Sequence, residues 1–244
     1  VRVSLNDDYT PNFNRIESAI SNKTKMIVIN NPHNPTGRIW TESDFEALET
    51  ILEKHPQILI LGDEVYEYIT FSQPHISFNT RPKLVERTII ASSFGKSLHV
   101  TGWKVGYLIA TENLMFEMKK VHQFLVFSVN SFSQHAISEY LDVVDFSEVS
   151  KMYQRKRDLF QNLIKDSRFE LMPCDGTYFQ VVNYNQISSK NDVDFAKELI
   201  VNHGVASIPI SVFYNDATDR HMLRFCFAKT DETLIAAAEK LNQI

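Results

Sequence analysis

The stretch "TIIASSFGKSLHVTGWKVGYLIA", residues 88–110, joins two apolar runs through a polar segment rich in small residues. Residues 88–91 and 105–110 have the β-branched, apolar composition of buried strands. Lys96 lies between them, among serines and glycines rather than the glutamates that usually flank a surface lysine. This setting indicates a lysine with a specific task at the end of a strand.

Two further apolar runs, residues 26–29 and 58–61, precede this stretch. Between them, Thr41 and Asp44 have the spacing of a capping box ahead of a helical apolar pattern. Continuous apolar strands separated by crossovers are typical of a largely parallel sheet with helices on both faces. The sequence therefore predicts an α/β fold, with a mostly parallel sheet and flanking helices in a large domain over residues 1–135.

The pattern changes after about residue 131. A long helical stretch over 131–165, broken near 144–149, precedes three strand-like segments and two helices. We expect the strands at 178–182, 204–210 and 221–228, and the helices near 193–202 and 231–243. This order predicts a smaller α+β domain over residues 136–244 that includes the long connecting helix.

The first residues raise an expectation of their own. Residues 2–5 have the pattern of a strand, yet no methionine and no lead-in precede it. The chain also has only 7 glycines and no glycine-rich phosphate loop. We expect that an N-terminal part of the large domain is missing.

Composition argues against several classes of function. The net charge is −5 and no stripe of lysine and arginine stands out, so we expect no nucleic-acid partner. No apolar run reaches the length of about 18–20 residues that spans a bilayer, so we expect no membrane partner. The eight histidines form no metal-binding spacing. Cys174 and Cys226 are far apart, and two reduced thiols in a cytoplasmic protein are expected.

Polar motifs follow three of the predicted strands directly. They are "NNPHNPTG" (30–37), "GDEVYEY" (62–68) and "SSFGK" (92–96). Alone, each is ambiguous, because a turn, a helix-capping aspartate or a solvated lysine is common. Ligands bind beyond the carboxyl ends of parallel strands, so the ordered set predicts one shared site. The side chains gathered there would be Asn34, Asp63, Tyr66, Ser93 and Lys96.

These groups suit pyridoxal 5′-phosphate (PLP). That cofactor needs an amine for a Schiff base, an anion at its pyridine nitrogen, donors to its phenolic oxygen, and partners for its phosphate. Seven motifs carry a resemblance: "NNPHNPTG", "DEVYEYITF", "SSFGKSLHVTGWKVGY", "HQFLVFSVN", "GTYF", "SIPISVF" and "LRFCFAK". Through them the chain resembles the fold-type-I PLP-dependent class I/II aminotransferases, in the methionine/kynurenine aminotransferase-like branch.

The resemblance implies roles around the cofactor ring. Lys96 matches the Schiff-base lysine, and Asp63 matches the carboxylate that faces the pyridine nitrogen. Tyr66 and Asn34 match the two donors to the phenolic oxygen, and Val65 matches the small apolar residue under the ring. Lys96, Asp63 and Tyr66 are thus the catalytic residues that the resemblance implies.

The resemblance also implies a phosphate site. Ser93 and Lys104 match phosphate-binding positions, although many relatives have arginine where this chain has Lys104. Ser92 either joins them or caps the strand end. Gly95 and Gly102 either allow a close backbone approach or serve tight packing.

Substrate binding is implied at two places. Arg224, with Asn34, matches the clamp for the substrate α-carboxylate; a structural arginine paired with an acid is the alternative. Dicarboxylate-specific relatives carry an arginine in the region that matches residues 122–130, which here is apolar and aromatic. That composition favours methionine or an aromatic amino acid, or else these residues only pack the helix. Because this segment crosses a dimer interface in the family, a homodimer is also implied.

The expected function is PLP-dependent transfer of the amino group of an apolar L-amino acid, methionine or aromatic, to a 2-oxo acid through the Lys96 Schiff base. The expected partners are therefore small molecules. Two alternatives stay open: a PLP-dependent carbon–sulfur β-lyase, which shares the lysine and the aspartate, and a catalytically silent fragment of such an enzyme.

Overall fold

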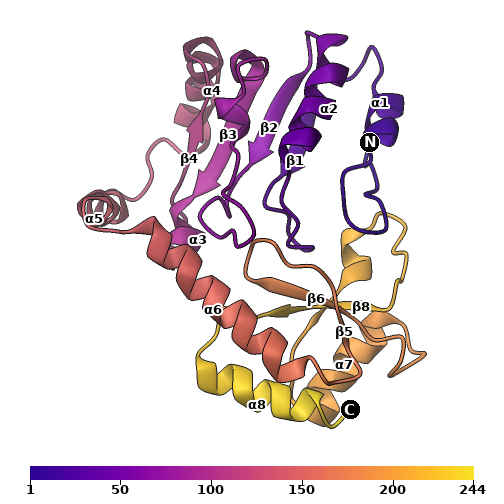
Figure 1. Cartoon of the computed structure of the whole chain (residues 1–244). Coiled ribbons are helices and arrows are strands. Elements are labelled where there is room, and N and C mark those ends of the chain that lie inside the picture. The colour runs from indigo at the N-terminus through magenta and orange to yellow at the C-terminus, as the bar shows by residue number, and fades with distance from the viewer.

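Two units make up the chain, and a computed structural model describes all of its residues, 1–244 (Figure 1). Each unit contains one four-stranded sheet. The N-terminal sheet has the strands β1 (Met26–Asn30), β2 (Leu59–Asp63), β3 (Thr88–Ser93) and β4 (Gly106–Ile109), in that order across the sheet. The first three strands are parallel and β4 is antiparallel to β3. The predicted mostly parallel sheet is confirmed.

Helix α2 (Glu42–Glu53) covers one face of this sheet. The backbone N–H of Asp44 donates to the Thr41 hydroxyl, and the Asp44 carboxylate accepts from the Thr41 N–H, so the predicted capping box is present. Phe45 and Leu48 on its apolar side are fully buried against Ile60 of β2. Burying a side chain of this size stabilises the fold by about 1.5–3 kcal/mol. The short helix α1 (Phe13–Ala19) lies beside α2.

The other face of the sheet is less covered. Val28 of β1 is 65% exposed, whereas the next residue, Ile29, is buried. Helix α4 (Glu112–Leu125), which follows β4, contains no buried residue. Helices were predicted on both faces of the sheet. Helix α2 packs closely on one face, whereas apolar side chains on the other face, such as Val28, are exposed.

The C-terminal unit combines an antiparallel sheet with three helices. Its strands are β5 (Glu170–Leu171), β6 (Phe179–Asn183), β8 (Met222–Cys226) and β7 (Ile208–Pro209), in sheet order, and its helices are α6 (Phe146–Ile164), α7 (Asp192–His203) and α8 (Asp231–Leu241). Helices α6 and α8 lie side by side (Figure 1). Phe160, Phe225 and Leu234 join α6, β8 and α8 in one core. The predicted α+β arrangement is confirmed.

Shorter elements complete the chain. They are α3 (Phe94–Ser97), α5 (Ser131–Leu141) and 3₁₀ turns at Phe78–Thr80, Val85–Arg87, Thr101–Trp103 and Ile210–Phe213. The predicted break in the long helical stretch falls at 142–145, between α5 and α6. The strand predicted over 204–210 is only two residues long, because Gly204 and Val205 still belong to the C-terminal cap of α7 and a 3₁₀ turn begins at Ile210. The domain division at residues 135 and 136 stays a prediction.

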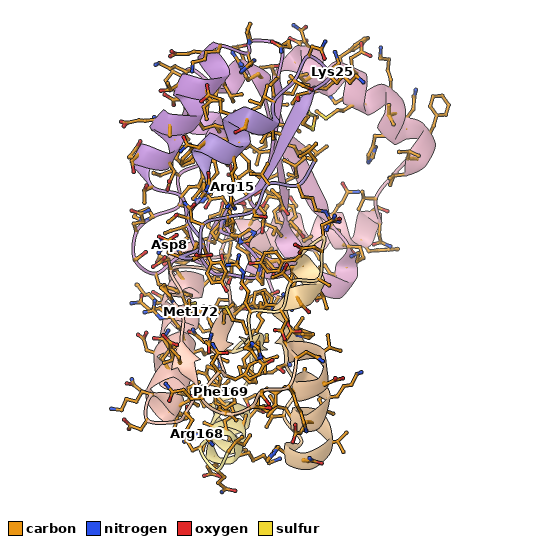
Figure 2. The ribbon with its side chains drawn as sticks, turned by 90° about the vertical axis from the view of Figure 1, so that its right-hand side faces the viewer. Asp8, Arg15, Lys25, Arg168, Phe169 and Met172 are labelled. Atoms are coloured by element: carbon orange, nitrogen blue, oxygen red, sulfur yellow. The ribbon has the colours of Figure 1, made fainter.

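The predicted strand at residues 2–5 is wrong. These residues form no ladder, and an irregular segment precedes α1. That segment runs to the C-terminal unit, where Asp7 pairs with Arg220 at 3.0 Å and the Tyr9 hydroxyl donates to Met222. Figure 2 shows Asp8 where the two units meet, Lys25 at the far end of the N-terminal unit and Arg168 at the opposite end. A strand-like composition forms a strand only where a partner edge is available.

A backbone seam joins the two units. The carbonyl of Gly37 accepts hydrogen bonds from the N–H groups of Asp175 (2.9 Å) and Gly176 (2.8 Å). The N–H of Thr177 donates to the carbonyl of Ile69 at 2.8 Å. A Cβ atom on Gly176 would lie 2.9 Å from that same carbonyl oxygen, so only glycine fits there. The loop before β6 is therefore held closely against the N-terminal unit.

None of the helices combines the length and the apolar composition needed to cross a lipid bilayer.

Candidate active site

The ends of the parallel strands meet at one edge of the N-terminal sheet. Asn30 of β1 is in register with Asp63 of β2, which is in register with Ala91 of β3. The Asn30 side chain donates to the Asp63 carbonyl at 3.0 Å and accepts from the Asn34 N–H at 2.7 Å. The three polar motifs predicted to share a site therefore leave the sheet side by side.

Asp63 is a partly buried carboxylate at the end of β2. Burial raises the pKa of this group, and the neighbouring Glu64 raises it further, whereas the Val65 N–H and Lys96 oppose the shift. The Val65 N–H donates to Asp63 Oδ1 at 3.3 Å. Asp63 has no ion-pair partner of its own, so a cationic group entering this site would gain a partly desolvated carboxylate.

Lys96 lies on the single turn of helix α3. The Ser93 hydroxyl caps this turn by accepting from the Gly95 N–H at 3.1 Å. The Lys96 ammonium group forms no ion pair; instead, its Nζ lies 6.0 Å from the ring centroid of Tyr66 and 5.8 Å from that of Tyr178. The lysine amine thus lies beside two aromatic rings that contact each other, without a carboxylate to hold it.

A cavity of about 250 Å³ opens beside Lys96. Its lining consists of Ser93, Gly95, Lys96, Thr101, Lys104, Val105 and Gly106. Two lysines and two hydroxyl groups face this space and no acidic residue does, which is the composition of an anion site. Lys104 has a φ of 58°, in the left-handed region. Ser93, Lys96 and Lys104 are therefore brought together as the sequence predicted.

The two glycines of this stretch differ. A Cβ atom on Gly95 would lie 3.0 Å from the Thr101 Cα and 3.1 Å from the Ser93 Oγ, so the close approach predicted for Gly95 is present. Nothing lies within 4 Å of a Cβ atom built on Gly102. Neither a close approach nor tight packing explains Gly102 within this chain.

Ser92 does not line the cavity. Its buried hydroxyl donates to Glu67 Oε1 at 2.6 Å, and the Tyr107 hydroxyl donates to the same oxygen at 2.5 Å. Ser92 thus ties β3 and β4 to the segment after β2. Neither of the two roles considered for it, a phosphate ligand or a strand-end cap, describes this contact.

Arg224 of β8 reaches across to the N-terminal unit. Its Nη1 donates to Asn34 Oδ1 at 2.5 Å. Its guanidinium carbon lies 3.9 Å from the Phe179 ring centroid and 5.4 Å from that of Phe213. Arg224 forms no ion pair, its Nε is buried without a hydrogen-bond partner, and burial lowers its pKa. The alternative of a structural arginine paired with an acid is therefore not observed.

Tyr66 lies between these groups. It is 3% exposed, and burial raises the pKa of its phenol, so the hydroxyl stays protonated and able to donate. Arg224 and Asp63 are close enough to affect the pKa of Tyr66: the charge of Arg224 lowers it and that of Asp63 raises it. Asn34, Asp63, Tyr66, Lys96 and Arg224 thus form one connected group.

Residues 122–130 do not join this group. Phe124 and Phe127 are each 85% exposed and Leu125 is 78% exposed, so the alternative that they pack the helix does not hold within this chain. With Leu108, Leu125 and other residues at the end of α4 border a separate apolar cavity of about 420 Å³.

Sequence reasoning missed three aromatic residues of the site. Tyr178 faces Lys96, while Phe179 and Phe213 flank the guanidinium of Arg224. They belong to "GTYF" and "SIPISVF", which contributed to the resemblance without roles for single residues. In the sequence, each of these residues is an aromatic residue beside a tight loop. That pattern identifies a site residue only when the loop is known to lie near Lys96.

The arrangement fits PLP on three observations. Lys96 is an amine without an ion-pair partner, the adjoining cavity is cationic, and Arg224 Nε is a buried donor without an acceptor. A buried donor without an acceptor calls for an explanation, and a ligand bound beside Arg224 would supply one. Asp63 adds the anion that a protonated ring nitrogen requires.

Comparisons with known sequences and structures show which proteins this chain is similar to. A methionine aminotransferase of Escherichia coli is 44% identical over 228 residues, which are 92% of this chain and 59% of the relative. A kynurenine–oxoglutarate transaminase of Dictyostelium discoideum is 33% identical over 96% of this chain and 59% of its own length. The crystal structure of YbdL from Escherichia coli, identified with a methionine aminotransferase function, has a TM-score of 0.97 and 41% identity, covering all of this chain and 65% of that one. The chain thus spans about three fifths of the length of these sequence relatives.

The family model for aminotransferase class I and II matches residues 1–241. That match includes both units and every site residue described above. The enzymes of this family depend on PLP. The chain belongs to the class I and II aminotransferases.

Proposed function

We propose that this protein transfers the amino group of an apolar L-amino acid, methionine or aromatic, to a 2-oxo acid, with PLP as its cofactor. The observation that carries the proposal is Lys96, an amine without an ion-pair partner between a carboxylate-bearing strand end and a cationic cavity. The proposal is supported by the relatives, a methionine aminotransferase and a kynurenine–oxoglutarate transaminase. When bound, PLP supplies an aldehyde that bonds to amines and a ring that withdraws electrons from the substrate α-carbon.

Six side chains would hold the cofactor. Lys96 bonds to it through Nζ, and the Asp63 carboxylate keeps its ring nitrogen protonated. The Asn34 side-chain oxygen accepts from Arg224, which leaves the Asn34 Nδ2 free to donate to the phenolic oxygen together with the Tyr66 hydroxyl. Ser93 and the cationic cavity bind the phosphate.

Lys104 supplies charge to the phosphate without the two-pronged geometry of arginine. Its left-handed backbone directs it from the 3₁₀ turn at Thr101–Trp103 into the cavity that Ser93 also lines.

Lys96 would also move the proton in the reaction. Once the substrate amine has replaced it, the freed Nζ takes the proton from the substrate α-carbon. Asp63 would assist, because its charge would favour the electron withdrawal on which the acidity of the α-carbon depends.

Arg224 would bind the substrate α-carboxylate. Its Nη1 donates to Asn34, whereas its Nη2 has no hydrogen-bond partner and is not among the enclosed atoms, so Nη2 would be the donor available to a carboxylate. The Phe179 and Phe213 rings on either side fix the plane of the guanidinium group, which matters for planar recognition of a carboxylate.

We also propose a homodimer for the protein. Phe124, Leu125 and Phe127 support it, because they are exposed apolar side chains that follow one another closely at the end of α4, and contiguous exposed apolar groups mark interaction surfaces. Residues 122–130 contain no arginine, and this supports the choice of an apolar rather than a dicarboxylic substrate. The free thiols Cys174 and Cys226 support a cytoplasmic location.

Borohydride reduction followed by peptide mapping tests the proposal. The reduction fixes the bond between the cofactor and its lysine, and the modified peptide is expected to contain Lys96. Amino transfer from methionine, phenylalanine and aspartate to a 2-oxo acid is then measured, with the first two expected to react. Modification at a different lysine would refute the assignment of Lys96. Release of pyruvate and ammonia from a cysteine S-conjugate, without amino transfer, would instead identify a β-lyase.

A further inference from the structure

Two tyrosines of the C-terminal unit contact both ends of the short segment that carries Lys96. The ring centroid of Tyr178 lies 5.8 Å from Lys96 Nζ. Three residues after Lys96, the Nδ1 of His99 and the Tyr153 hydroxyl share a hydrogen bond of 3.1 Å. The rings of Tyr153 and Tyr178 are themselves in contact, with centroids 5.5 Å apart. The two tyrosines therefore form a contacting pair, and this pair touches the segment 96–99 at Lys96 and at His99.

Tyr153 is a buried residue of α6. It is 4% exposed, and its hydroxyl has His99 as its only hydrogen-bond partner. Burial raises the pKa of the Tyr153 phenol, so the group stays protonated at neutral pH. His99 has a φ of 59°, in the left-handed region that a histidine enters only at a cost. The Tyr153 hydroxyl is thus one of the contacts that hold this backbone turn.

Tyr178 is held from the other side by the seam between the units. Thr177, just before it, is fully buried and donates its N–H to the Ile69 carbonyl at 2.8 Å. The Tyr178 carbonyl accepts from the Phe227 N–H at 3.0 Å. The Tyr178 ring also meets the Tyr66 ring edge to face, at 5.4 Å. The ring is therefore fixed relative to the strand end that carries Asp63 and Tyr66.

We propose that Tyr153 and Tyr178 are positioning residues for the Lys96 amine. Tyr178 provides an aromatic face that attracts the ammonium group and keeps Nζ beside Tyr66, where the cofactor aldehyde and the substrate α-carbon must come. Tyr153 holds the far end of the same segment through His99. The proposal rests on the proposed function, since it assigns the two residues to the lysine on which that function depends.

Labelling of the cofactor-free protein tests the contact directly. A brief pulse of acetic anhydride modifies lysine amines, and mass spectrometry of the peptides gives the rate at Lys96 relative to the exposed Lys25. Replacing Tyr178 by leucine removes the aromatic face, and an increase of about two- to fivefold in the relative rate at Lys96 is expected. Tyr178→Phe keeps the ring and is expected to label as the unchanged protein does.

Two milder variants test the other contact. His99→Asn tolerates the left-handed backbone and lies on the exposed side, so it leaves the core intact, while Tyr153→Phe removes only the hydroxyl. Both are expected to raise the relative rate at Lys96. The matched control is Tyr184→Phe, which removes an equally buried hydroxyl that donates to the Lys190 carbonyl at 2.9 Å, away from the site. An unchanged rate at Lys96 in Tyr178→Leu and His99→Asn would overturn the proposal.

Kinetics of the protein loaded with PLP separate positioning from substrate binding. Tyr178→Leu is expected to lower kcat for amino transfer from methionine while KM stays near its original value, and Tyr178→Phe to restore kcat. A raised KM with unchanged kcat would assign Tyr178 to the substrate pocket and overturn the proposal. The labelling experiment needs neither cofactor nor substrate. If the unchanged protein shows no amino transfer, the proposed function is refuted. The labelling rates at Lys96 still decide whether Tyr153 and Tyr178 position the lysine.

Discussion

The guanidinium group of Arg224 donates a hydrogen bond to the side-chain oxygen of Asn34, 2.5 Å away, across a separation of 190 residues. This bond joins β8 of the C-terminal unit to the loop after β1 of the N-terminal unit. It leaves one nitrogen of the arginine buried without an acceptor. The same pair of residues therefore connects the two units and defines where a carboxylate would enter.

Arg224→Lys is expected to weaken binding of the amino acid. Lysine keeps the charge but loses the planar pair of donors, and a charged hydrogen bond of this kind contributes about 1.5–3 kcal/mol, so kcat/KM should fall about ten- to hundredfold. The change should lie mainly in KM, measured with methionine as donor. The absorbance of the bound cofactor should not change. Loss of that absorbance would show that Arg224 supports the fold of the site instead.

Asp63→Asn is expected to retain PLP and to slow proton abstraction by about a hundredfold or more, since a preorganised charge is removed from the site. Exchange of the methionine α-hydrogen in D₂O, followed by NMR, measures this step without the second half of the reaction. Asp142→Asn changes an exposed carboxylate at the end of α5 and serves as the control. Exchange at the unchanged rate in Asp63→Asn would remove Asp63 from the mechanism.

The same Asp63 substitution has a pH-dependent effect on stability. Burial raises the pKa of Asp63 in the folded protein, so the ionised carboxylate costs stability above that raised pKa, and the cost vanishes as pH falls below the ordinary value of 3.8. Cofactor-free Asp63→Asn should therefore have a higher Tm than the unchanged protein at pH 7, and the difference should shrink on acidification. Thermal unfolding followed by circular dichroism from pH 7 towards pH 4 tests the direction. A lower Tm at pH 7 would contradict it.

Lys104 is expected to contribute charge to phosphate binding. Lys104→Ala should weaken PLP binding about tenfold, because one charge-assisted hydrogen bond is lost, whereas Lys104→Arg should bind at least as tightly as the unchanged protein. Titration of the cofactor-free protein, followed by absorbance, gives both affinities. Equal affinity in Lys104→Ala would place the phosphate elsewhere.

Gly176→Ala is expected to destabilise the fold by about 1–3 kcal/mol, because the new Cβ atom would lie 2.9 Å from the Ile69 carbonyl oxygen. Urea unfolding measures the loss. Gly102→Ala is the matched control, since nothing lies within 4 Å of a Cβ atom there. If the two variants unfold alike, the seam does not constrain Gly176.

The central strands could be predicted from the sequence because the patterns that indicate them lie within a few consecutive residues. The runs at 26–29, 58–61 and 88–91 are apolar throughout, as buried parallel strands must be, and Thr41 with Asp44 fixed the start of α2. Residues 2–5 have a similar composition but meet no partner edge, so the same reasoning gave a strand that does not form.

The part of the site that directly follows the strands of the N-terminal sheet could be predicted from the sequence. Ser92 and Ser93 look alike in the sequence, yet successive strand residues point to opposite faces, so Ser93 lines the cavity while Ser92 bonds to Glu67. Tyr178 and Phe213 come from loops more than a hundred residues away from Asp63. Their contacts depend on how the C-terminal unit meets the N-terminal one, and no local pattern carries that information.

The seam at Gly37 and Ile69 also sets the mechanics of the molecule. Because the loop before β6 is bonded to the N-terminal unit, a rotation of the C-terminal unit would have its pivot close to Gly176. Tyr178, next to the pivot, would hardly move. Val181 and its ladder partner Arg224 lie further along the lever and would sweep a longer arc. In such a rotation, the loop before β6 would keep Tyr178 beside Lys96 while Arg224 moved relative to Asn34.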